Sequence, residues 1–213
     1  MVLLSKAFNH WGVWVYYYMD RSHISNLYKN GHSMLLYKVS LYLDQVLDGV
    51  IVPNYLFRDD NSLRVTSLID EFTEKFKPYK SINVPLLFQN DINTGLKNLQ
   101  KAKSHNRHRY VLTEILEHDD YSIAMEVPLW QYKFQTKTGA KNVTGHIDLL
   151  RFKPDADKIE ILDYKPEGVS VAPRVKIQVL LYRELLCRML DLKPEDVNVG
   201  WFTNDSMYKI EFN

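Results

Sequence analysis

Cysteine is almost absent from this 213-residue chain, which contains only Cys187. A single thiol excludes an internal disulfide framework and a cysteine-ligated iron–sulfur cluster, and it fits a reducing compartment. Glycine and proline are also scarce, at 8 residues each, which argues against a linker-rich or disordered chain. We therefore expect a folded protein in the cytoplasm, or in the host cytoplasm for a viral protein.

Long hydrophobic runs and a charge excess of one sign are missing as well. No stretch approaches the roughly 20 apolar residues of a membrane helix, and the apolar run in residues 1–6 is too short for a signal peptide. We therefore expect no association with a membrane. The formal net charge is +1, so any nucleic-acid interface must come from a local basic surface.

Apolar residues recur at helical spacing over the first half of the chain. This period predicts helices over residues 22–47, 63–76, 92–103 and 109–116, the second capped by Asn61-Ser62 and ended before Pro78. We expect a mainly helical region, residues 1–104, packed on a core formed by residues 105–213. The pattern changes between residues 78 and 105, where the helical part is either a separate unit or an insertion.

The second half of the chain has strand patterns. Strands are predicted over residues 121–130, 143–152, 158–165, 197–203 and 207–212, with turns at 154–157 and 204–206. A helix is predicted over residues 173–190, with proline in its first turn. The order is therefore helices followed by β-β-β-α-β-β.

Two of these strands carry charge among apolar residues. Asp163 and Lys165 follow Ile161 at alternate positions, which places them on one face of the strand, about 7 Å apart. Asp148 lies in the preceding strand, and Asp148 and Asp163 are equally far from the turn at 154–157. A hairpin around this turn would bring the two carboxylates together.

Converging carboxylates of this kind point to a bound cation. Two nearby carboxylates repel each other unless a positive charge lies between them, and their oxygens suit Mg²⁺ or Mn²⁺. Such an ion acidifies water and stabilises charge on a phosphate, while Lys165 would hold the attacking water or neutralise the developing charge. The competing interpretation is a buried Asp163–Lys165 ion pair in an unrelated α+β protein.

Three short motifs follow one another in order along the second half. They are Gly145-x-x-Asp148, Asp163-x-Lys165 and Gln178-x-x-x-Tyr182. The last pair lies one helical turn apart, a spacing that by itself is common at the rim of a core. As a set, the motifs resemble those of the RecB-like nucleases in the PD-(D/E)XK superfamily, which include the CRISPR-associated RecB-like exonucleases. The resemblance covers about residues 105–213.

The resemblance implies an α/β fold with a restriction-endonuclease-like core, in which a central mixed β-sheet is flanked by helices. It implies a deoxyribonuclease dependent on Mg²⁺ or Mn²⁺, an exonuclease, an endonuclease or both. Many CRISPR-associated relatives also hold an iron–sulfur cluster with four cysteines, which this chain lacks. We expect residues 14–18, with Trp14 and three tyrosines, to supply packing in its place.

The resemblance also implies roles for individual residues. The groups expected to ligate the metal are Asp148, Asp163 and the main-chain carbonyl of Tyr164. The side chains expected to serve catalysis beside them are the catalytic lysine Lys165, with Gln178 and Tyr182, which would orient the site and contact DNA.

The family uses one further metal ligand, a histidine ahead of the first core strand. His108 lies at a typical distance before Asp148, with His105 as the near alternative and His32 as the distant one. A surface histidine in a basic segment is the competing interpretation. Glu126 lies in a strand where relatives often carry an acid, and it either assists the site or is solvated.

Basic residues gather in two segments that are candidates for DNA binding. The first contains Lys97, Lys101, Lys103, Arg107 and Arg109, with His105 and His108, and the second contains Arg174, Lys176 and Arg183. Each is either a track for phosphates or a solvated charged face. Near-neutral total charge favours a narrow track, so we expect single-stranded DNA or duplex ends as substrate, with little dependence on sequence.

The expected partner is therefore DNA, and the resemblance leaves open a homo-oligomer or a partner from recombination or replication. The alternative function is a catalytically silent DNA-binding or assembly subunit that retains the nuclease fold. The complete set of Asp148, Asp163 and Lys165 argues against this alternative, because a binding module does not need all three.

Overall fold

A computed structural model describes the chain over residues 3–10, 12–29, 31, 33–58, 62–166 and 172–212. Its strands are β1 Leu3–His10, β2 Val13–Asp20, β3 Ser62–Arg64, β4 Lys80–Val84, β5 Ser122–Thr136, β6 Gly139–Lys153, β7 Lys158–Tyr164, β8 Val197–Phe202 and β9 Met207–Glu211. Its helices are α1 Arg21–Lys29, α2 Met34–Asp48, α3 Ile69–Phe76, α4 Gln89–Lys101, α5 Arg107–His118 and α6 Ala172–Leu190.

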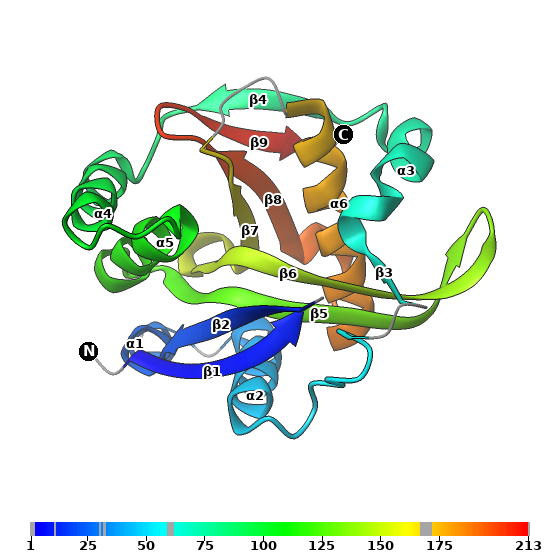
Figure 1. Ribbon diagram of the computed structural model, residues 1–213, viewed down its shortest axis with the longest axis horizontal. Coiled ribbons are helices and arrows are strands. Elements are labelled where there is room, and N and C mark those ends of the chain that lie inside the picture. Colours follow the sequence, from blue (N-terminus) through cyan, green and yellow to red (C-terminus); the bar gives the residue numbers. More distant parts are fainter. Residues whose placement is uncertain are drawn as a thin grey trace.

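Within these ranges the nine strands form one mixed sheet (Figure 1). Its order is β1-β2-β5-β6-β7-β8-β9-β4, and β3 pairs with β6 beside this path. β7 and β8 are parallel because α6 connects them, and β3 is also parallel to β6, whereas the other pairs are antiparallel.

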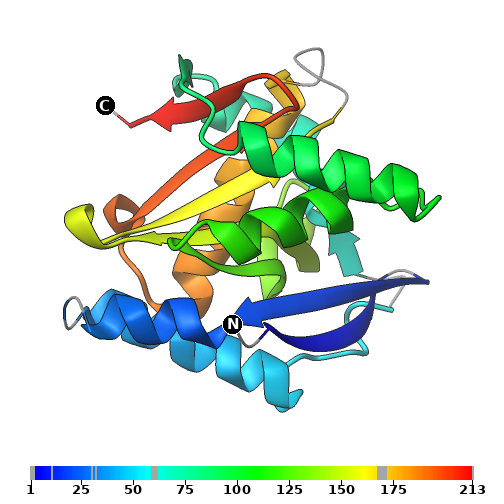
Figure 2. The ribbon, with the colours of Figure 1, turned by 90° about the vertical axis from the view of Figure 1, so that its left-hand side faces the viewer.

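Helices cover both faces of the sheet, and the strand period distributes its side chains between them. Leu150 and Ile161 belong to a core shared with α2, α3 and α6. Their neighbours Leu149 and Leu162 belong to a second core shared with α4 and α5, which lie over the sheet in Figure 2. The predicted α/β fold, a mixed sheet flanked by helices, is therefore confirmed.

The N-terminal region differs from its prediction, because residues 3–10 and 13–20 are strands rather than helices. β1 and β2 form an antiparallel hairpin, and β2 joins the main sheet through Tyr18, opposite Met125 of β5. The physical reason is the composition of β2, whose β-branched and aromatic side chains favour a pleated surface over a helix. The proposed division at residue 104 stays a prediction, and the sheet contains strands from both sides of it.

The helix predicted over residues 22–47 is divided into α1 and α2. Ser33 begins the second helix, where its hydroxyl accepts a hydrogen bond from the backbone N–H of Leu36 at 3.0 Å. Gly49 ends that helix in a left-handed conformation, with φ 73°. A serine cap and a glycine stop satisfy backbone groups at the two ends, so α2 forms as a separate element.

The helix predicted over residues 63–76 begins later than expected. Ser62 lies in β3 rather than at a helix cap, a 3-10 turn, η1 Val65–Leu68, follows, and the α-helix is confined to α3. Asn61 lies outside the described residues. β4 was not predicted, because this exposed edge strand has no buried alternating face to mark it.

The remaining predicted elements are confirmed. The helices expected over residues 92–103 and 109–116 correspond to α4 and α5, and the helix expected over 173–190 corresponds to α6. The five predicted strands correspond to β5, β6, β7, β8 and β9, although β5 and β6 extend further toward their connecting turn. Among the described residues, no helix combines the length and the apolar character needed to cross a membrane.

Candidate active site

The candidate site begins with the hairpin of β6 and β7. These strands pair through Leu149 with Leu162 and Leu150 with Ile161, so the next position of the same register sets Asp148 opposite Asp163. The predicted hairpin is thus confirmed. Both carboxylates are buried, with 5% of Asp148 and none of Asp163 exposed. Buried carboxylates on adjacent strands need a compensating positive charge.

The carboxylate of Asp163 contacts two residues of the predicted motifs, Lys165 and Gln178. Its Oδ2 lies 2.5 Å from Nζ of Lys165, and its Oδ1 accepts a hydrogen bond from Nε2 of Gln178 at 3.2 Å. The same amide group donates to the hydroxyl of Tyr182 at 2.8 Å, one turn along α6. Burial, together with Asp163 and Asp148, raises the pKa of Tyr182, which therefore remains a neutral hydroxyl.

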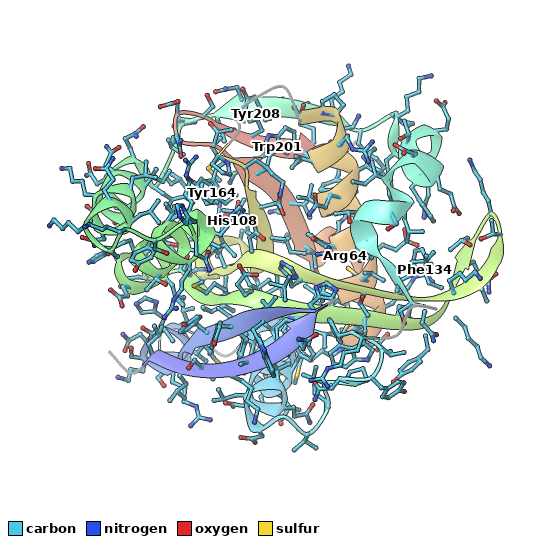
Figure 3. All side chains as sticks on the ribbon, viewed as in Figure 1. Arg64, His108, Phe134, Tyr164, Trp201 and Tyr208 are labelled. Atoms are coloured by element: carbon cyan, nitrogen blue, oxygen red, sulfur yellow. The ribbon has the colours of Figure 1, made fainter. Side chains whose placement is uncertain are left out.

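Asp148 and His108 meet at the end of β7. The backbone N–H of Tyr164 donates to Oδ2 of Asp148 at 2.8 Å. Nε2 of His108 lies 2.9 Å from the carbonyl oxygen of Tyr164 and 3.7 Å from Oδ2 of Asp148. Figure 3 shows His108 and Tyr164 next to each other between α5 and the sheet. His105 is exposed before α5, and His32 lies outside the described residues.

These donor groups fit a divalent cation. The imidazole nitrogen of His108 lies beside the Tyr164 carbonyl and the carboxylate of Asp148. Asp163 lies opposite Asp148 in the register of β6 and β7. Nitrogen and oxygen donors of this kind, with two negative charges, suit Mg²⁺ and Mn²⁺ rather than a soft metal. The residues that could hold such an ion are therefore His108, Asp148, Asp163 and Tyr164.

Glu126 extends the row of acids to a third strand. Met125 pairs with Leu149 and Val127 with Ile147, so Glu126 lies opposite Asp148 in the register of β5 and β6. Its backbone is left-handed, with φ 55°, which is strained for a residue with a side chain. Its side chain is 15% exposed, so it faces the site rather than solvent. Burial, then Asp148 and Asp163, raises the pKa of Glu126.

His146 is a functional candidate that sequence reasoning missed. Its Nε2 lies 3.2 Å from Oε2 of Glu126, and donor atoms of Glu126, His146 and Asp148 all lie within 4.8 Å of one another. Burial lowers the pKa of His146 to about 4, so the ring is neutral near pH 7 and able to ligate a metal. The available signal was its position, two residues before Asp148 on one face of a strand.

The N-terminal hairpin also reaches the site through His10. Nδ1 of His10 lies 3.2 Å from Nδ1 of His146, and its Nε2 lies 3.2 Å from the hydroxyl of Thr144. Burial, with further contributions from His146 and Arg64, lowers the pKa of His10 to about 3. A neutral histidine pair results, in which one ring donates to the other. No local pattern links His10 to His146, so this contact was not predictable.

A cavity of about 350 Å³ opens onto these residues. Its wall contains side chains of β2, notably Trp14, Tyr16 and Tyr18, and its base contains Asp148 and Lys165. A further set of lining residues carries the chemistry of the site: Glu126, His146, His108, Gln178, Tyr182, Arg64 and Arg109. The cavity therefore joins the motif residues to the N-terminal hairpin.

Of the basic residues predicted to bind DNA, only some line this cavity. Arg109 lines it, and so does Arg64 of β3, which was not predicted and is labelled in Figure 3. Arg107 is exposed and outside the lining. Arg174 pairs with Asp70 at 2.8 Å, and Lys176 donates to the carbonyl of Tyr79 at 3.1 Å, so neither belongs to the cavity wall.

Comparison with known proteins identifies the class to which this fold and site belong. A family model described as the PD-(D/E)XK nuclease superfamily matches residues 64–208, more than half of the chain. The chain belongs to the PD-(D/E)XK nuclease superfamily, and its α/β fold is the restriction-endonuclease-like fold of that superfamily. No curated protein and no solved structure matched the chain.

Membership of this superfamily indicates the class of reaction. It indicates a hydrolase that acts on nucleic acid with a divalent metal, and it excludes the unrelated α+β protein considered above. The ion pair between Asp163 and Lys165 is present, and it lies within the residues that the family model matches. The matched range contains every motif residue and Arg64, whereas β1 and β2 precede it.

Proposed function

We propose that the protein is a RecB-like deoxyribonuclease that uses Mg²⁺ or Mn²⁺ to hydrolyse phosphodiester bonds. The observation that carries this proposal is the meeting of His108, Asp148, Asp163 and the carbonyl of Tyr164 at the end of β7, with Lys165 beside Asp163. The RecB-like assignment rests on the third motif, in which Gln178 of α6 donates to Asp163 and to the hydroxyl of Tyr182.

The metal ligands proposed are His108, Asp148, Asp163 and the Tyr164 carbonyl. A bound divalent cation would acidify water and stabilise negative charge on the phosphate. The protein contributes the fixed geometry, since Asp148 accepts from the Tyr164 N–H and Asp163 accepts from Gln178. Preorganised charges of this kind do not have to reorganise when the bond breaks.

Lys165 is the proposed catalytic lysine. Its side chain is 21% exposed and lines the cavity, so its ammonium group can reach a phosphate oxygen or the attacking water while it remains beside Asp163. A positive donor at this position stabilises the charge that develops on phosphorus. Tyr182 holds Gln178, and Gln178 holds Asp163, so these two residues position the acid.

The proposed substrate is single-stranded DNA or the end of a duplex. A cavity of about 350 Å³ is comparable to a small-molecule site, which suits one or two nucleotides better than a continuous duplex. Arg109 in the cavity and Arg107 beside it are proposed phosphate contacts, and Arg174 and Lys176 remain proposed contacts further along the strand. The absence of a base-reading motif supports cleavage with little sequence specificity.

The proposal also covers the cellular location of the enzyme and its protein partners. A single cysteine supports a cytoplasmic location. A homo-oligomer, or a partner from recombination or replication, stays a proposal that rests on the family resemblance alone.

The test uses purified protein and end-labelled single-stranded DNA, duplex DNA and RNA, each incubated with Mg²⁺, Mn²⁺ or EDTA. We expect metal-dependent cleavage of DNA that Asp163→Asn and Lys165→Ala each reduce by at least 100-fold, the scale of a lost charge-stabilising group. Matched controls are Asp155→Asn and Lys193→Ala, which change exposed residues outside the cavity. Activity that survives both site substitutions would refute the proposed site, and metal-independent binding without cleavage would favour the silent subunit.

A further inference from the structure

Three aromatic side chains of β2 form one wall of the cavity. Trp14, Tyr16 and Tyr18 occupy alternate positions, so they share a face of the strand, and all three line the cavity that contains Asp148. Tyr17 lies between them on the opposite face, where it is fully buried and its hydroxyl donates to the carbonyl of Leu43 at 3.2 Å. The two faces of β2 therefore have different roles.

The exposure of this wall is not explained by packing. Trp14 is 57% exposed and Tyr16 is 44% exposed, although burial of large aromatic side chains is strongly favourable. The expectation that residues 14–18 supply packing is right for Tyr17 and wrong for Trp14 and Tyr16. Adjacent exposed rings beside a functional cavity are characteristic of a binding surface.

Positive charge lies among these rings. The guanidinium of Arg109 is 5.7 Å from the ring centroid of Tyr16 and 6.0 Å from that of Tyr18. Arg64 lines the same cavity from the side of β3. Aromatic faces that stack on bases, combined with cations that neutralise phosphates, are the means by which proteins bind an unpaired strand without reading its sequence.

We propose that the β1–β2 hairpin is a base-stacking platform for single-stranded DNA, on which Trp14 and Tyr16 contact unpaired bases next to the cleaved phosphate. Arg64 and Arg109 neutralise phosphates of the same strand. Only an unpaired base offers its face to a ring, so the platform selects single strands over continuous duplex. This inference rests on the proposed nuclease function, because it assigns the surface that would bind the substrate of that site.

The test measures binding without cleavage, in EDTA, by the fluorescence anisotropy of two labelled 12-mers. One is oligothymidylate, and the other is an abasic strand with the same phosphates and no bases. Wild-type protein is expected to bind oligothymidylate more tightly. Trp14→Ala and Tyr16→Ala are each expected to weaken that binding about tenfold, equivalent to ~1.4 kcal/mol, and to leave binding of the abasic strand unchanged.

Matched variants separate stacking from general damage. Trp14→Phe and Tyr16→Phe keep a ring and are expected to retain most of the affinity for oligothymidylate. Tyr37→Ala removes an exposed ring from α2, outside the cavity, and is expected to change nothing. Arg109→Ala is expected to weaken binding of both strands, because it removes a phosphate contact. Thermal melting checks that each variant is folded.

Two results would overturn the platform. One is oligothymidylate binding by Trp14→Ala and Tyr16→Ala at the wild-type affinity. The other is an equal loss of affinity for both strands, which would assign the hairpin to phosphate binding alone. Because this assay contains no metal, a failure to cleave DNA would refute the proposed nuclease function and leave base-dependent binding as a separate observation.

Discussion

At the scale of single residues, the site is dominated by three acids in one row across β5, β6 and β7. Glu126 lies opposite Asp148, and Asp148 lies opposite Asp163. Lys165 balances one of these charges at 2.5 Å from Asp163, and His146 contacts Glu126 at 3.2 Å. Repulsion within the row is therefore relieved only in part, and a bound divalent cation would relieve the rest.

A metal-binding measurement tests this row directly. Mn²⁺ at about 100 times its dissociation constant is expected to stabilise the wild-type fold by about 2.7 kcal/mol, which raises Tm by about 5–10 °C. Asp148→Asn is expected to abolish that shift and to melt above the wild type in EDTA, since one repelling charge is gone. Asp155→Asn, on the exposed turn, serves as the control. An unchanged Mn²⁺ shift in Asp148→Asn would contradict the assignment of this ligand.

Another buried acid outside this row, Glu160, has a structural role and gives a pH prediction. It is 1% exposed, forms an ion pair with Arg151, and lies 2.5 Å from Nζ of Lys209. Burial by itself would raise the pKa of Glu160, but Arg151, Lys209 and Lys153 outweigh it and lower the pKa below its ordinary value of 4.5. The carboxylate therefore stabilises the fold above about pH 4.5, and this contribution is lost as pH falls through the lower pKa of the folded state.

Glu160→Gln is expected to lower the free energy of unfolding at pH 7 by about 3 kcal/mol, because Arg151 loses one buried partner. The difference from wild type should shrink between pH 5 and pH 3, where the wild-type carboxylate takes up its proton. Urea unfolding at several pH values measures both effects, with the exposed Glu195→Gln as control. A difference that stays constant over this range would exclude the charge of Glu160 as its cause.

At the scale of elements, the glycine of the first motif is explained by the contact between β6 and α6. A Cβ atom on Gly145 would lie 2.9 Å from Cε1 of Tyr182 and 3.0 Å from Cγ2 of Val65. Only a residue without a side chain allows Tyr182 to come this close to the strand. Gly145, Tyr182, Gln178 and Asp163 are thus connected by successive contacts from the first motif to the third.

Gly145→Ala is expected to displace the ring of Tyr182, cost about 1–3 kcal/mol of stability and reduce kcat at least tenfold through Gln178. Gly31→Ala is the matched control, since no atom lies within 4 Å of the added carbon there. Thermal melting and initial rates on oligonucleotide substrate measure the two effects. Normal kcat in a folded Gly145→Ala protein would show that Tyr182 does not position the acid.

Helices and strands were predicted correctly where their apolar side chains repeat with a strong period, and they were missed where this period is absent. α4, α5 and α6 and the strands from β5 to β9 were predicted because their apolar side chains repeat at helical or strand spacing. β4 is exposed, and β1 and β2 depend on pairing with each other and with β5. Their conformation is decided by tertiary contacts, which local spacing does not contain.

At the scale of the whole molecule, near-neutral charge would limit how the proposed DNA substrate is held. The net charge is +1, and the described cationic side chains that line the cavity are Arg64, Arg109 and Lys165. Few cations would therefore be released from DNA on binding, and the affinity is expected to depend weakly on salt. The proposed stacking on β2 would then supply a larger share of the binding free energy.

Salt titration of oligothymidylate binding measures how much of the binding free energy is electrostatic. The three cations of the cavity are expected to give a slope of log K against log salt of about −2, from the factor of roughly 0.7 per phosphate for single strands. The proposed contacts outside the cavity, Arg107, Arg174 and Lys176, would extend this slope to about −4 at most. Anisotropy measured in EDTA between low and moderate KCl gives the slope. Arg109→Ala should reduce it by about 0.7, whereas Trp14→Ala should leave it unchanged. A slope steeper than about −4 would indicate a broad basic surface instead.

The sequence by itself determined the hairpin that carries Asp148, Asp163 and Lys165, and the helix that carries Gln178 and Tyr182. These contacts lie within one continuous segment, so strand and helix periods are enough to bring their side chains together. Tertiary structure alone decided that Glu126 faces these acids, and that His10, Arg64 and the rings of β2 surround them. His10 and His146 are 136 positions apart, and only the closure of one sheet around a shared core brings such distant residues into contact.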